Sequence, residues 1–124
     1  MNWEWQSRRG ERVQLRMRGE AGTDPREIEI ASAEGESLGR LTLRAEGEEV
    51  VIEALCIAPE RRGYGAGSEA LALLLEGLPR GVRRLRAWAP GTLGLAVYFW
   101  IRHGFRPLFG PGPDEGIWFE RLVQ

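Results

Sequence analysis

The residues best suited to chemistry lie in a glycine-rich loop between residues 59 and 70. Pro59 ends an apolar run, and helical spacing of apolar residues follows from Ala70. The loop glycines are Gly63, Gly65 and Gly67. Glycine has no side chain, so backbone amides can approach a ligand closely. The unpaired amides at a helix start, with the positive end of its dipole, suit phosphate.

Two arginines, Arg61 and Arg62, add positive charge to this loop. The alternative interpretation is a tight turn flanked by solvated arginines. The strand before the loop and the helix after it favour an anion site instead. A Walker A loop is excluded because the chain has no lysine. A dinucleotide fingerprint is disfavoured because residues 82–92 contain no acid to hold a ribose.

One acidic residue, Glu53, lies inside the apolar run 50–58. It is either a general base for a bound amine or an ordinary outward-facing strand residue, and the sequence leaves both open. Cys56 lies in the same run without a neighbouring histidine, so a buried small residue is favoured over a nucleophile. One cysteine and one histidine, His103, cannot form a zinc site, so no metal is expected.

Composition indicates one globular domain over residues 1–124, with 43% hydrophobic and 28% charged residues. The net charge of -1 predicts no nucleic-acid partner, and the basic cluster 83–86 is interpreted as solvated strand charge. The longest apolar stretches, 70–75 and 95–101, are too short to cross a bilayer. With no signal pattern and a single cysteine, we expect a cytoplasmic protein without membrane contact. Trp3, Trp5 and Trp118 are candidates for the core or for a homodimer surface.

The hydrophobic pattern predicts a mixed α/β sheet. Period-two alternation predicts strands near residues 13–17, 27–30, 38–45, 50–58, 82–88, 105–109 and 116–123. An earlier strand at Trp3 and Trp5 would connect through residues 8–10. Helical spacing predicts one helix ending at Pro79 and a second that begins after Thr92 and ends at Gly104. The apolar stripe of the second helix would be Leu93, Ala96, Val97, Trp100 and Ile101.

Two segments together resemble the GNAT superfamily of N-acetyltransferases. Arg62-x-x-Gly65-x-Gly67 resembles the [Q/R]-x-x-G-x-[G/A] signature of that family. Residues 96–105, which end in Gly104-Phe105, resemble its later helix-to-strand segment. The two matches occur in the family's order, and the resemblance covers about residues 38–123.

The resemblance implies a mostly antiparallel sheet whose central parallel strand pair splays apart to hold acetyl-CoA as co-substrate. The pantetheine arm would pair with the backbone of Leu55, Cys56 and Ile57. The pyrophosphate would be held by the amides of Arg62, Gly63, Tyr64, Gly65, Ala66 and Gly67, with Ser68 nearby. The implied activity is transfer of an acetyl group to a primary amine by direct attack in a ternary complex.

The sequence departs from the family pattern in three places. Trp100 occupies the position where many members have a tyrosine general acid, and Tyr98 faces away from it along the helix. Leu93 replaces a common asparagine. Only residues 19–26 stand where members place acceptor-side helices. The alternative function is therefore a non-catalytic acyl-CoA-binding or regulatory module of the same fold.

Overall fold

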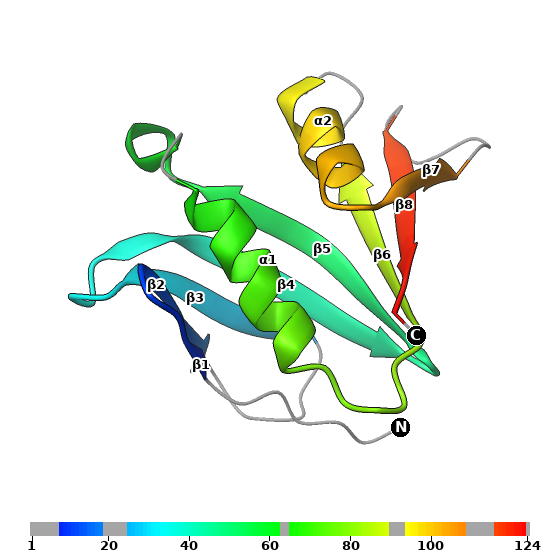
Figure 1. The fold of residues 1–124 in the computed structure, drawn as a ribbon, viewed down its shortest axis with the longest axis horizontal. Helices are drawn as coiled ribbons and strands as arrows, with labels where there is room; N and C mark the ends of the chain where they lie inside the picture. The colour runs from blue at the N-terminus through cyan, green and yellow to red at the C-terminus, as the bar shows by residue number, and fades with distance from the viewer. Residues whose placement is uncertain (1–7, 19–24, 63–64, 90–93, 109–115, 124) are drawn as a thin grey trace.

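The computed structural model describes residues 8–18, 25–62, 65–89, 94–108 and 116–123. Within them, eight strands form one sheet in the order β1-β2-β3-β4-β5-β6-β8-β7 (Figure 1). The elements are β1 (Arg8–Arg9), β2 (Val13–Arg18), β3 (Arg26–Ser32), β4 (Ser37–Glu46), β5 (Glu49–Ile57), a 3-10 turn (Pro59–Arg61), α1 (Ala66–Glu76), β6 (Arg84–Ala89), α2 (Gly94–Arg102), β7 (Arg106–Leu108) and β8 (Ile117–Leu122). Neighbouring strands are antiparallel except β5 and β6, which are parallel. The predicted mixed sheet is confirmed.

Both helices pack on one face of this sheet and share one apolar core. Leu71 of α1 and Trp100 of α2 belong to the same buried cluster as Ile28 of β3. Val51 is buried but lies outside that cluster, because alternate residues of a strand point to opposite faces. In Figure 1, α1 crosses the strands β2 to β5 while α2 lies beside the end of β6.

The parallel strands β5 and β6 separate part of the way along their length. Their pairing runs from Glu49 opposite Arg84 to Ile52 opposite Ala87. Beyond that point β5 continues to Ile57 and β6 to Ala89 without further pairing between them. Figure 1 shows the two strands side by side near the C-terminus and diverging toward the start of α1. This divergence is the splayed pair that the family resemblance implied.

A β-bulge lies at the point where the two strands part. Thr42 of β4 pairs with Ala54, whereas the next residue, Leu43, pairs with Ile52. Glu53 is therefore the extra residue on β5. A bulge leaves one residue outside the regular ladder and redirects its side chain. Glu53 thus stands at the apex of the opening between β5 and β6.

The structure corrects three local predictions. Arg8–Arg9 forms strand β1 rather than a connection, because it pairs with β2 through Leu15 and Gln14. Cys56 is exposed, not buried, because it lies on the side of β5 away from the core, past the last pairing with β6. Ile101 is 51% exposed, so it does not belong to the buried stripe of α2. Trp3, Trp5, Thr92 and Leu93 lie outside the described residues.

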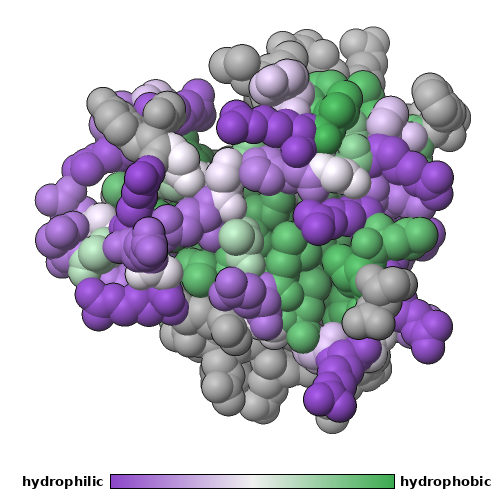
Figure 2. All heavy atoms as spheres, in the orientation of Figure 1, coloured by the Kyte–Doolittle hydropathy of each residue, from purple (hydrophilic) through white to green (hydrophobic). Residues whose placement is uncertain are grey.

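The helix-bearing face has apolar side chains in its centre and charged side chains around them (Figure 2). At the C-terminal end of α1, a hollow is lined by Leu75, Leu78, Pro79, Arg80, Val82, Arg121, Leu122 and Val123. Neither described helix has the length and apolar character needed to cross a membrane.

Candidate active site: the opening between β5 and β6

The far end of β5 presents to the opening a strand edge that pairs with no other described strand. Leu55, Cys56 and Ile57 pair with β4 through Leu41, Arg40 and Gly39 respectively. On the side toward β6, pairing of β5 with a described strand stops at Ile52. A strand edge carries backbone donors and acceptors at regular spacing, and an extended ligand can pair with it as an added strand.

Helix α1 begins immediately beyond this edge. Its N-cap residue, Gly65, has φ 81°, in the left-handed region that favours glycine. A Cβ built on Gly67 would lie 3.3 Å from the ring of Phe99 in α2, so glycine allows the two helices to approach closely. Gly65 itself has no side chain that could cap the first turn of α1. The amides of this turn therefore retain the capacity to bind an anion.

The two arginines of the loop use their side chains elsewhere. Arg61 pairs with Glu36 in the turn between β3 and β4. Arg62 donates from Nε to the carbonyl oxygen of Ile57 at 2.9 Å, which fixes the chain as it leaves β5. Gly63 and Tyr64, predicted for the same loop, lie outside the described residues.

The sequence reasoning missed a contribution from the turn between β1 and β2. The carboxylate of Glu69, in the first turn of α1, accepts hydrogen bonds from the amides of Arg12 and Val13, each at 2.8 Å. A Cβ built on Gly65 would lie 3.7 Å from Nη1 of Arg12. No local pattern signals this contact, because Glu69 is 57 positions from Arg12.

A second contact joins the helices on either side of the opening. Ser68 Oγ lies 2.9 Å from Nε2 of His103, which follows α2. The ring of His103 lies 4.6 Å from that of Phe99, and its carbonyl oxygen accepts a hydrogen bond from Arg121. Burial, and then the positive charges of Arg102 and Arg121, lower the pKa of His103 from its ordinary value. The imidazole is therefore favoured in its neutral form at neutral pH.

Glu53 is accessible at the apex of the opening. Its side chain is 40% exposed, and Oε2 lies 3.8 Å from Nε of Arg44. That arginine also pairs with Glu46. A carboxylate with this exposure can accept a proton directly or through water.

Trp100 and Tyr98 differ sharply in their surroundings, although both belong to α2. Trp100 is 4% exposed, and its ring packs 4.8 Å from Phe105 and 5.1 Å from Phe99. Tyr98 is 63% exposed. The prediction that Tyr98 faces away from the position of Trp100 is confirmed.

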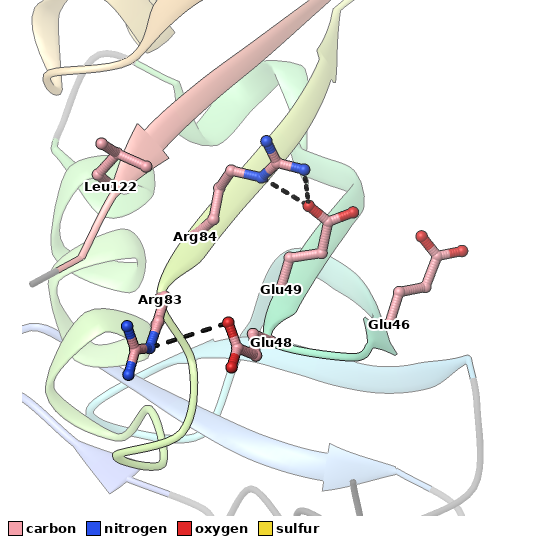
Figure 3. Close-up of a pocket in the computed structure, with 6 residues that line it drawn as sticks. All are labelled: Glu46, Glu48, Glu49, Arg83, Arg84 and Leu122. Atoms are coloured by element: carbon pink, nitrogen blue, oxygen red, sulfur yellow. Dashed lines mark hydrogen bonds and ion pairs between the residues drawn. The ribbon is translucent and has the colours of Figure 1, made fainter.

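A separate hollow lies at the other end of the parallel pair, where β5 and β6 begin (Figure 3). It is lined by Glu46, Glu48, Glu49, Arg83, Arg84 and Leu122. Figure 3 shows Arg84 directed at Glu49, with Nε 2.7 Å from Oε2, and Arg83 directed at Glu48. Since these charges are paired and remote from the start of α1, this hollow is not the candidate site.

Comparison with known proteins agrees with this geometry. The sequence profile of the acetyltransferase (GNAT) family matches residues 1–105. The chain belongs to this family, and the resemblance found in its motifs is confirmed. The match also includes the first strands, which the motif resemblance did not cover. No curated protein matches the chain significantly.

Solved structures of the family share the fold. An acetyltransferase from Thermus thermophilus is 31% identical, with a TM-score of 0.72 over 82% of this chain and 67% of that chain. A GCN5-related N-acetyltransferase from Brucella melitensis is 17% identical, with a TM-score of 0.81 over 98% of this chain and 80% of that one. A GNAT family acetyltransferase from Elizabethkingia anophelis, with acetyl-CoA bound, is 13% identical, with a TM-score of 0.72 over 92% and 100%.

Proposed function

We propose that the protein is an acetyl-CoA-dependent N-acetyltransferase that acetylates a primary amine in a ternary complex. The observation that carries this proposal is the parting of β5 from β6 beside the first turn of α1. Family membership supports acyl transfer from an acyl-CoA. The bound acetyl-CoA of the Elizabethkingia anophelis protein, which shares the fold, supports acetyl-CoA as co-substrate.

Two sets of backbone groups would bind different parts of the cofactor. The edge of β5 at Leu55, Cys56 and Ile57 would pair with the amides of the pantetheine arm. The amides of Arg62, Gly63, Tyr64, Gly65, Ala66 and Gly67, with the hydroxyl of Ser68 close by, would hold the diphosphate. This arrangement would direct the thioester toward the apex at Glu53.

Transfer requires a neutral amine beside the thioester carbonyl. We propose that Glu53 takes the proton from the amine, directly or through water. The neutral amine nitrogen forms a bond to the carbonyl carbon and loses its second proton to water, and the carbon–sulfur bond then breaks. The products are an amide and the CoA thiolate. A CoA thiol resembles a cysteine thiol, with a pKa of about 8.5, so the thiolate can leave without a tyrosine acid or take a proton from water.

The buried position of Trp100 supports a second candidate function. A tryptophan packed in the core cannot donate a proton as a tyrosine general acid would. This feature is compatible with a non-catalytic module that binds acyl-CoA. The two functions differ in turnover but not in cofactor binding.

The test is thiol release from acetyl-CoA across a panel of primary amines, together with calorimetric titration of CoA. The panel includes polyamines, drug amines, lysine peptides and peptides with free N-termini. Amine-dependent thiol release establishes the transferase. CoA binding with no release on any amine supports the non-catalytic module, and the absence of CoA binding excludes both functions.

A further inference from the structure

The candidate diphosphate site receives positive charge from an unexpected part of the chain. The side chains of Arg61 and Arg62 are directed to Glu36 and to the carbonyl of Ile57. Arg12, from the turn between β1 and β2, places Nη1 3.7 Å from the Cβ position of Gly65. A guanidinium therefore lies close to Gly65, the N-cap residue of α1.

We propose that Arg12 is a further cofactor-binding residue whose guanidinium contacts the diphosphate of coenzyme A. This inference rests on the proposed function and assigns a role to the N-terminal hairpin in it. A guanidinium presents several donors in one plane and matches the paired oxygens of a phosphate group. Its positive charge would add to that of the helix dipole at the same place.

The backbone at Arg12 is held in position by α1 itself. Glu69 Oε2 accepts from the amides of Arg12 and Val13, and it lies where a Cβ on Gly10 would be only 2.6 Å away. Glycine at position 10 thus leaves room for the carboxylate. A backbone fixed in this way loses little conformational freedom when a ligand binds.

The same contact lessens an electrostatic conflict. A carboxylate in the first turn of α1 would repel a diphosphate bound there. Because two amides of the hairpin bind one oxygen of Glu69, its charge is directed toward the hairpin. The turn therefore supplies donors to the Glu69 carboxylate and also places a cation near the start of α1.

The experiment compares wild type with Arg12→Ala, Arg12→Lys and the control Arg80→Ala. Arg80 is an exposed arginine beyond the other end of α1, so its replacement changes the net charge equally. Dissociation constants are measured for CoA, 3′-dephospho-CoA and pantetheine, which lacks the diphosphate. Circular dichroism checks that each variant is folded. The main-chain hydrogen bonds to Glu69 do not require the Arg12 side chain.

We expect Arg12→Ala to raise the dissociation constants of CoA and 3′-dephospho-CoA by about tenfold or more. The dissociation constant of pantetheine should not change. Arg12→Lys should recover part of the loss, and Arg80→Ala should bind like wild type. Equal weakening of pantetheine would indicate a structural role and overturn the inference. A loss confined to CoA would place the contact at the 3′-phosphate and overturn the diphosphate assignment.

The failures of the two proposals are distinguishable. If wild type binds CoA but Arg12→Ala binds it equally well, only the inference about Arg12 is overturned. If wild type does not bind CoA at all, the proposed function fails and the inference about Arg12 fails with it.

Discussion

The hydroxyl oxygen of Ser68 lies 2.9 Å from Nε2 of His103, and this contact connects the first turn of α1 to the end of α2. Each helix follows one of the two parallel strands, so the hydrogen bond spans the opening between β5 and β6. The contact therefore joins the two halves of the sheet, and the tautomer of His103 sets which of the two groups donates.

Stability should decrease in mild acid because of His103. Its pKa is lowered in the folded state, first by burial and then by Arg102 and Arg121. The unfolded chain takes up a proton near pH 6.5, whereas the folded chain does so only at lower pH. The free energy of unfolding should therefore fall as the pH drops below 6.5, until it passes the lowered pKa.

Urea unfolding of wild type and His103→Gln at pH 7.5 and 5.5 measures this effect. The glutamine can still hydrogen-bond Ser68 but does not titrate, so the variant should lose less stability between the two pH values. Glu120 does not interfere, because its hydrogen bond with Arg106 lowers its pKa from 4.5 and keeps it charged at both pH values. The same pH dependence in both proteins would exclude His103 as the source.

Replacing Gly65 by leucine should cost both stability and CoA affinity. Gly65 has a positive φ of 81°, where an L residue is strained by about 1–2 kcal/mol. A leucine side chain there would also occupy the space beside the α1 amides. We expect CoA to bind at least tenfold more weakly, measured by calorimetry.

Gly47→Leu is the matched control for this prediction. Gly47 also has a positive φ, 58°, and nothing lies within 4 Å of its Cβ position. It belongs to the turn between β4 and β5, away from α1. Both variants should lose similar stability, but only Gly65→Leu should bind CoA poorly. Equal CoA affinity in the two variants would contradict the assignment of the diphosphate site.

Glu53→Gln should reduce turnover and leave cofactor affinity unchanged. The substitution removes the proposed base, whose contribution is about 100-fold or more, while it preserves the size of the side chain. Glu46→Gln is the control, because Glu46 pairs with the same Arg44 but lies at the end of β4. Thiol release at saturating acetyl-CoA distinguishes the two, and equal rates in all three proteins would remove Glu53 from the mechanism.

Trp100→Ala should destabilise the protein severely, whereas Tyr98→Ala should not. Truncating a buried tryptophan costs about 3–5 kcal/mol, since it leaves a cavity between Phe99 and Phe105. An exposed side chain such as Tyr98 contributes about 0.5 kcal/mol or less. Thermal and urea unfolding of both variants gives the comparison. A similar small loss in both would mean that Trp100 is not a core residue.

Local sequence patterns predicted most of the elements. Alternation at Val13, Leu15 and Met17 predicts β2. The glycine-rich loop before an amphipathic segment predicts the start of α1. Gly104 ends the second helix as expected, with φ 86°. These signals depend on backbone conformation and on burial of one face, both of which are set by residues a few positions apart.

Other local predictions failed where tertiary packing decided the outcome. Cys56 belongs to an apolar run, yet it is exposed because β6 has already diverged from β5 at that point. Ile101 fits a helical stripe, yet the core is filled by Trp100 and Phe105 instead. Burial depends on what lies opposite a residue, and a periodic pattern does not carry that information.

The sequence by itself determines the family of this protein, the order of its strands and helices, and a glycine-rich helix start suited to phosphate. Only the tertiary structure decided that Glu53 sits in a bulge, that Arg12 reaches Gly65, and that Ser68 meets His103. The last two pairs bring together residues tens of positions apart. They exist only after the order of strands in the sheet has placed those segments together, so no local pattern encodes them.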